Sequence, residues 1–140
     1  WGLKGANSTE FNKETKYPVV DLMESQRAIK VKGGTMRLGA YDCFIKTGTK
    51  TFAAYRKKKI SERHRHRYEV NNRFRKRLEK SGLIFSGLNE ELGVVETIEI
   101  PNHPWFVAGQ FHPELKSRVN HAHPLFRNFI GAAVKFDQTK

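Results

Sequence analysis

Hydrophobic positions along this chain fall into short runs and alternations that predict strands, with stretches of helical period between them. The alternation is clearest over residues 35–46, which predict one long strand. Its two faces carry Met36, Leu38, Ala40 and Phe44, and Arg37, Tyr41, Cys43 and Ile45. Four further strands are predicted at residues 17–23, 83–88, 94–100 and 105–108.

Three segments have the pattern of helices. Residues 50–58 place aromatic side chains three positions apart, and a second helix follows Asn71, a good N-cap residue, and ends at Gly82. A third starts at Pro124, because proline suits the first turn of a helix. No internal repeat or low-complexity tract interrupts the series. Strands and helices therefore mix, and the pattern predicts an α/β domain.

Composition narrows the class of protein. The 140 residues are 38% hydrophobic and 11% aromatic, enough for a single modest core. No apolar run approaches the length of a membrane span, and the first residues lack the basic-then-apolar pattern of a signal peptide. One cysteine excludes an internal disulfide framework and fits a reducing cytosol. We therefore expect a cytoplasmic protein without a membrane anchor.

The positive charge is concentrated in one run. The net charge is +12, and residues Arg56 to Arg77 contribute +9 of it, from eleven Lys or Arg against Glu62 and Glu69. Such density is typical of a surface that binds a polyanion. Aromatic residues within or beside the run (Tyr55, Tyr68 and Phe74) make a nucleic-acid-binding module an alternative function.

Candidate chemistry gathers at the end of the strand predicted for residues 105–108. His112 is followed by Pro113, which biases the histidine towards an extended backbone, and by Glu114 two positions on. Glu114 can accept a hydrogen bond from one ring nitrogen and so leave the other free to take a proton. The pattern predicts a general base with its orienting carboxylate, and it lacks a nucleophile.

Other reactive residues have simpler interpretations. Cys43 lies within an alternating strand, without the glycine-rich turn that exposes a nucleophile, so it is expected in the core. The remaining histidines of interest lack cysteine or carboxylate partners at a helpful spacing, and we predict no metal site: His64, His66, His121 and His123. Gly33-Gly34 predicts a turn rather than a phosphate-binding loop.

Four strings resemble a known family. QFHPE at residues 110–114 resembles the His-Pro-Glu signature of class I glutamine amidotransferases. Three more, together with the longer NHPWFVAGQFHPE, are similar to the CTP synthase branch of that family: GANSTEF at 5–11, GGTMRLGAYDC at 33–43 and ERHRHRYEVNN at 62–72. The resemblance implies a Rossmann-like α/β amidotransferase fold, of which residues 1–140 are the C-terminal part, with a mixed sheet and flanking helices.

The resemblance also implies site residues. In that family a cysteine thiolate attacks the carboxamide of glutamine and forms a γ-glutamyl thioester. His112 would carry the protons, with Glu114 holding its ring. Glu10 and Arg67 would bind the α-ammonium and α-carboxylate of L-glutamine. The family's nucleophilic cysteine has no counterpart here, so this segment alone is expected to be inactive.

The wider family implies the partners. The ammonia would pass to a synthase domain of the same polypeptide, which is outside this chain and aminates UTP to CTP. ATP and magnesium would act there, GTP would be an allosteric activator, and the intact protein would form a homotetramer. No cofactor is expected in this segment, and a nucleic-acid partner is not expected under this interpretation.

Overall fold

The computed structural model describes residues 2–22 and 36–139. The turn predicted at Gly33-Gly34 and the outer ends of two predicted strands (residues 23 and 35) lie outside the described residues. The strands are β1 (Asn7–Ser8), β2 (Pro18–Leu22), β3 (Arg37–Ile45), β4 (Lys59–His66), β5 (Tyr68–Val70), β6 (Ile84–Asn89), β7 (Val94–Glu99) and β8 (Val107–Gly109). The helices are α2 (Lys50–Tyr55), α3 (Asn72–Lys80), the 3₁₀ turn η2 (Pro113–Leu115) and α4 (Pro124–Asp137).

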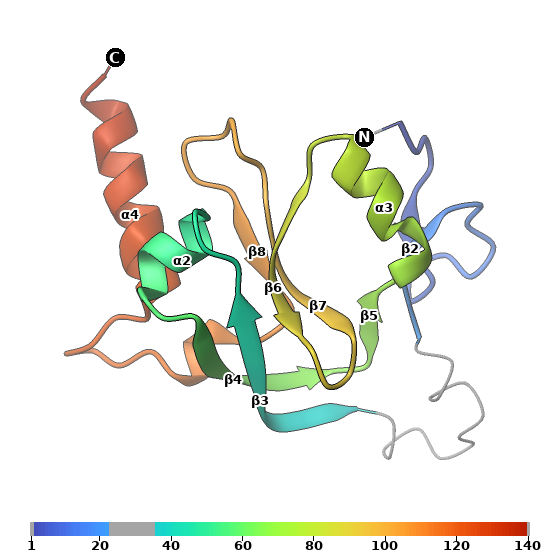
Figure 1. The fold of residues 1–140 in the computed structure, drawn as a ribbon, viewed down its shortest axis with the longest axis horizontal. Coiled ribbons are helices and arrows are strands. Elements are labelled where there is room, and N and C mark those ends of the chain that lie inside the picture. The colour runs from blue at the N-terminus through green and yellow to red at the C-terminus, as the bar shows by residue number, and fades with distance from the viewer. Residues whose placement is uncertain (1, 23–35, 140) are drawn as a thin grey trace.

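The strands form two sheets (Figure 1). The larger has the order β4-β3-β6-β7-β8 and is antiparallel throughout. The smaller has the order β1-β2-β5, with β1 parallel and β5 antiparallel to β2. β4 belongs to the larger sheet and β5 to the smaller, and only Arg67 separates them. The junction of the two sheets is therefore a single residue long.

The long strand β3 confirms the alternation read from the sequence. The face that carries Arg37, Cys43 and Ile45 is buried, whereas Leu38 on the opposite face is exposed. β3 pairs along most of its length with β4, from Arg37 opposite His66 to Phe44 opposite Lys59. Arg37, the first residue of β3, is therefore buried on the apolar face. A buried guanidinium needs acidic partners to offset the loss of its hydration.

Side-chain caps explain where the helices begin. The Thr49 side chain accepts from Phe52 N–H at the start of α2, and Asn71 caps α3 as predicted by accepting from Arg73 N–H. α4 begins at Pro124, also as predicted, with the His123 ring as its cap. Glu99 of β7 adds a second cap to α2, accepting from the backbone N–H groups of both its first residues, Lys50 and Thr51.

Two predicted boundaries were wrong. α2 ends at Tyr55 rather than residue 58, because Arg56 takes the left-handed conformation with φ 55° and β4 then starts at Lys59. β8 covers Val107–Gly109 rather than residues 105–108. The residues before it form the turn that leads back from β7, and pairing begins only at Val107 opposite Glu99.

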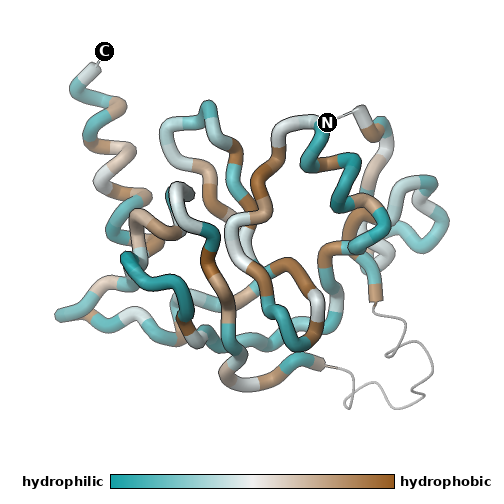
Figure 2. The backbone as a smooth tube through the Cα atoms, viewed as in Figure 1, coloured by the Kyte–Doolittle hydropathy of each residue, from teal (hydrophilic) through white to brown (hydrophobic). Residues whose placement is uncertain are grey.

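The core consists of three groups of buried apolar residues. One lies between β3, β4 and α2 (Cys43, Ile45 and Ile60), one under α4 (Ala54, Phe111 and Leu125), and one between β6, β7 and α3 (Leu83, Phe85 and Val95). Figure 1 shows α2 and α4 side by side, away from α3 and the smaller sheet. In Figure 2 the coloured tube of α3 is largely hydrophilic, whereas α4 has hydrophobic residues along its length.

Candidate functional site

His112 is held by its backbone at the point where the chain leaves the larger sheet. Its N–H donates to the carbonyl of Arg63 on β4 at 2.8 Å. Two residues earlier, Gln110 N–H donates to the carbonyl of Glu96 on β7, also at 2.8 Å. With φ −106° and ψ 89°, His112 has the extended conformation expected before Pro113, which starts η2. The imidazole is thus presented by a fixed backbone.

The predicted hydrogen bond between His112 and Glu114 is present. Nδ1 of His112 lies 2.6 Å from Oε1 of Glu114. This bond lowers the pKa of the Glu114 carboxyl group, so the carboxylate accepts and Nδ1 carries the proton. Nε2 is then the unprotonated nitrogen, and no residue of the described chain forms a hydrogen bond with it. One third of the His112 side chain is exposed.

A pocket of about 400 Å³ brings the two predicted glutamine-binding residues together. Glu10 and Arg67 both line it, although they are 57 positions apart in the sequence. The other lining residues are Val20, Met36, Arg65, His66, Tyr68, Gly109 and Gln110. His112 does not line the pocket, but Gln110, which does, is only two residues before it.

The smaller sheet positions Glu10, and the junction between the sheets positions Arg67. Thr9 donates from its backbone to the Val20 carbonyl at 3.0 Å and from its hydroxyl to Asp21 at 2.7 Å, which holds the loop after β1 against β2. Arg67 is the single residue between β4 and β5, and it is half-buried. A carboxylate from the loop after β1 and a guanidinium from the junction of β4 and β5 therefore share one pocket, an arrangement suited to a zwitterion.

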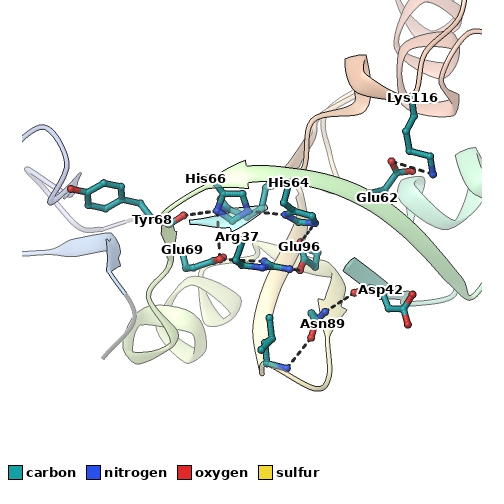
Figure 3. Close-up of polar contacts among 12 residues, drawn as sticks. Arg37, Asp42, Glu62, His64, His66, Tyr68, Glu69, Asn89, Glu96 and Lys116 are labelled. Atoms are coloured by element: carbon teal, nitrogen blue, oxygen red, sulfur yellow. Dashed lines mark hydrogen bonds and ion pairs between the residues drawn. The ribbon is translucent and has the colours of Figure 1, made fainter. Parts of the chain in front are cut away.

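A buried polar network lies behind this pocket (Figure 3). Arg37 contacts Glu69 at 3.2 Å and Glu96 at 2.7 Å through its two terminal nitrogens. His64 Nδ1 lies 2.7 Å from His66 Nε2. Each of these side chains except that of His66 is at most 5% exposed. The network links β3, β4, β5 and β7, so it fixes the strands on which the pocket is built.

The contacts determine where protons lie in this network. His66 Nδ1 is 3.1 Å from the Tyr68 carbonyl, so it donates, and His66 Nε2 accepts from His64 Nδ1. His64 Nε2 is then unprotonated, 3.4 Å from Oε2 of Glu96. Burial raises the pKa of Glu96 against the opposing effect of Arg37.

Burial also keeps both histidines neutral. It lowers the pKa of His64 to about 3 and that of His66 to about 4, with the charge of Arg37 adding to the effect in each case. Burial raises the pKa of Glu69 to about 7, although Arg37 opposes this shift. Neutral His66 therefore faces the pocket as a fixed hydrogen-bond donor to the Tyr68 carbonyl.

Cys43 and His123 have structural roles, as expected for Cys43. The Cys43 thiol is fully buried against Ile45 and Ile60, and burial raises its pKa to about 12, so it is not a thiolate at neutral pH. The His123 ring accepts from Leu125 N–H through Nδ1 and donates through Nε2 to Glu62 at 3.2 Å. Within residues 2–22 and 36–139, no group of three or more His, Cys, Asp or Glu could hold a metal ion.

The Lys and Arg residues of the run between Arg56 and Arg77 lie mainly on β4, just before it, and on α3. On β4 the outward positions carry Lys59, Arg63 and Arg65, and on α3 Arg75 lies over the Phe85 ring at 5.4 Å. Arg77 donates to the Gly2 carbonyl at 3.0 Å. Several of these charges thus hold neighbouring elements in place.

Among the described helices, none has the length and hydrophobicity needed to cross a bilayer.

Sequence reasoning missed the network and the pocket residues other than Glu10 and Arg67. Arg37 occupies the apolar face of β3, and a charged residue on such a face is a signal of a buried acidic partner. Gln110 lies within the QFHPE string beside the predicted base, but no periodicity assigned it to a pocket. For His66 the sequence predicts no metal site and no other role, whereas its ring contacts a backbone carbonyl in the structure.

Comparison with known proteins places these features in a family context. The family model for class I glutamine amidotransferases matches residues 8–132. CTP synthase of Chlorobaculum tepidum is 59% identical over 138 residues, which cover 99% of this chain and 24% of the relative. CTP synthase of Pelodictyon phaeoclathratiforme is 58% identical over 135 residues, covering 96% of this chain and 24% of the relative. The chain thus spans about a quarter of the length of these curated relatives.

A solved structure matches the fold as a whole. The glutaminase domain of a Trypanosoma brucei CTP synthase, solved with acivicin bound, has a TM-score of 0.86 and 38% sequence identity. The match covers 96% of this chain and 52% of that one. Together with the family model, it confirms the fold class predicted from the sequence.

Proposed function

This chain belongs to the class I glutamine amidotransferase family, and on that premise we propose that it is the glutamine-hydrolysing part of a CTP synthase. The observation that carries the proposal is the His112–Glu114 pair at 2.6 Å, next to a pocket shared by Glu10 and Arg67. A base with an orienting carboxylate and a pocket with charges for both ends of a zwitterion are the groups that hydrolysis of a free amino acid amide needs.

In the proposed reaction Glu10 pairs with the α-ammonium of L-glutamine, and Arg67 pairs with its α-carboxylate. A cysteine thiol from outside this chain gives its proton to His112 Nε2, and the sulfur attacks the carboxamide carbon. His112 returns the proton to the nitrogen as the C–N bond breaks, so ammonia leaves and a γ-glutamyl thioester remains. His112 then takes a proton from water, which attacks the thioester and releases glutamate and the thiol.

The nucleophile in this proposal must be supplied from elsewhere. Cys43 is the single cysteine of the chain, and its thiol is fully buried with a pKa of about 12. A thiol in that state is neither exposed nor ionised enough to attack a substrate. We therefore propose that these 140 residues hydrolyse no glutamine on their own.

We propose that a synthase domain of the same polypeptide carries out the remaining reaction, which uses the ammonia. There the ammonia would aminate UTP to CTP, and the ATP and magnesium required belong to that domain, as does assembly into a homotetramer. GTP is retained as an allosteric activator without an assigned binding site. No cofactor site is proposed within this chain.

A chimera tests the proposal. The segment of the Chlorobaculum tepidum CTP synthase that corresponds to this chain is replaced by the chain itself, and CTP formation is measured with glutamine or with free ammonia. The chimera should use both nitrogen sources. His112→Ala should abolish the glutamine-dependent reaction and leave the ammonia-dependent one intact.

The matched control is His121→Ala, which alters an exposed histidine outside the pocket and should leave both activities unchanged. Two results would contradict the proposal. One is a chimera that uses ammonia but not glutamine, and the other is an equal loss of both activities in the His112→Ala variant.

A further inference from the structure

The side-chain amide of Gln110 has a fixed orientation. Its terminal nitrogen Nε2 lies 2.9 Å from the carbonyl oxygen of Tyr68. A carbonyl oxygen only accepts hydrogen bonds, so the group facing it must be the amide NH₂. The flipped amide would put two oxygens 2.9 Å apart. The contact therefore identifies which end of the amide is nitrogen.

His66 shares the Tyr68 carbonyl with Gln110. Its protonated Nδ1 donates to the Tyr68 carbonyl at 3.1 Å and lies 3.4 Å from Gln110 Nε2. Both donors thus converge on one carbonyl, next to Arg67. The backbone of Gln110 is fixed as well, because its N–H donates to Glu96. The side chain has little freedom to turn over.

The other end of the amide, Oε1, is an acceptor in a residue that lines the pocket of Glu10 and Arg67. No donor from residues 2–22 or 36–139 forms a hydrogen bond with it. Gln110 and His112 are two residues apart, so their Cα atoms are at most about 7 Å from each other. Gln110 is therefore the pocket residue nearest in sequence to the candidate base, where the reacting group of a substrate would lie.

We propose that Gln110 Oε1 accepts a hydrogen bond from the carboxamide N–H of bound glutamine, which makes Gln110 a specificity-determining residue. The inference depends on the proposed function. The substrate's carboxamide carries two N–H donors, whereas the γ-carboxylate of the product glutamate carries none. An acceptor at this position attracts the substrate, repels the product carboxylate and so favours product release.

The test compares two substrates, one with that donor and one without it. L-Glutamine has an N–H on its leaving group, and the γ-methyl ester of L-glutamate has none. In the chimera, Gln110→Met should lower kcat/KM for glutamine about 10-fold, the usual effect of losing one hydrogen bond to a substrate. It should change kcat/KM for the ester less than twofold, and glutamate should inhibit the variant more strongly than the parent.

A second variant separates recognition from loss of the Tyr68 contact. Gln110→Lys retains a donor that can reach the Tyr68 carbonyl but has no acceptor, and it should show the same selective loss for glutamine. Val20→Ala is the control, since it enlarges the same pocket without touching a polar group and should affect both substrates alike. Ammonia-dependent CTP formation should be unchanged in every variant and reports on correct folding.

Equal losses for glutamine and ester in both Gln110 variants would overturn the inference, because a disturbed pocket does not distinguish leaving groups. An unchanged kcat/KM for glutamine would overturn it as well. Failure of the proposed function would differ from either result, since the unmutated chimera would then hydrolyse neither glutamine nor the ester.

Discussion

Nδ1 of His112 lies 2.6 Å from Oε1 of Glu114, so a residue only two positions further on sets the direction of the imidazole. The carboxylate both selects the tautomer with a free Nε2 and stabilises the imidazolium that forms when Nε2 takes a proton. A local pair of this kind depends on the backbone between the two residues, where Pro113 removes one degree of freedom.

Glu114→Gln should therefore lower kcat for glutamine hydrolysis in the chimera about 100-fold, because the amide keeps the size but not the charge that stabilises the imidazolium. The ammonia-dependent reaction should not change. Glu90→Gln, in the exposed turn between β6 and β7, is the control. An unchanged glutaminase kcat in Glu114→Gln would show that the carboxylate does not assist His112.

Glu10 and Arg67 should act on opposite ends of the substrate. Glu10→Gln removes the charge that pairs with the α-ammonium, and the KM for L-glutamine should rise about 10-fold or more. Glutaramate, which lacks the α-amino group, should be hydrolysed equally by the parent and by this variant. Arg67→Lys should instead weaken the binding of both substrates, since both retain the α-carboxylate position that Arg67 pairs with.

The matched control for this pair is Glu14→Gln, an exposed carboxylate that does not line the pocket. If Glu10→Gln weakened glutamine and glutaramate to the same degree, the carboxylate would have a role other than binding the ammonium group.

Glu99 should matter for stability rather than for catalysis. One oxygen accepts from Thr51 N–H at 2.7 Å and from the Thr51 hydroxyl at 2.6 Å, and the other accepts from Lys50 N–H at 2.8 Å. Glu99→Ala leaves these buried donors without an acceptor and should lower the free energy of unfolding by about 2–4 kcal/mol. Urea unfolding of the chain measures this, with exposed Glu79→Ala on α3 as the control. Similar midpoints for both variants would contradict the role of Glu99.

Features encoded within a few residues could be predicted from the sequence. The alternation of β3, the Asn71 cap of α3 and the start of α4 at Pro124 each depend on adjacent side chains and backbone preferences. The hydrogen bond between His112 and Glu114 belongs to the same class. These features need no knowledge of which strand pairs with which.

The rest of the site depends on contacts between distant segments. Arg37 meets Glu69 and Glu96, which are 32 and 59 positions away, only because β3 and its neighbours pair in one register. The orientation of the Gln110 amide likewise depends on the Tyr68 carbonyl, 42 positions away. Hydrophobic period indicates that a strand exists and which faces it has, but not its partner or its register.

The buried histidines and carboxylates should have opposite effects on the pH dependence of stability. The pKa of His64 is about 3 in the folded chain and about 6.5 when unfolded, so between these values the unfolded state binds more protons and stability falls as pH falls. Glu69 has a folded pKa of about 7 against about 4.5 unfolded. Between pH 4.5 and 7 the folded state binds more protons at Glu69, so its contribution rises as pH falls.

Removing His64 should therefore remove the loss of stability that its titration causes as pH falls. Relative to the parent chain, His64→Gln should gain stability as pH falls from 6.5 to 4, by up to about 1.4 kcal/mol per pH unit for the one proton removed. Urea unfolding at half-unit pH steps measures the difference, and His121→Gln, which alters an exposed histidine, should run parallel to the parent. A constant difference between His64→Gln and the parent across this range would mean that His64 titrates alike in both states. The assignment of neutral His64 and His66 in the network behind the pocket would then be incorrect. The tautomer that makes His66 a donor to the Tyr68 carbonyl would be incorrect with it.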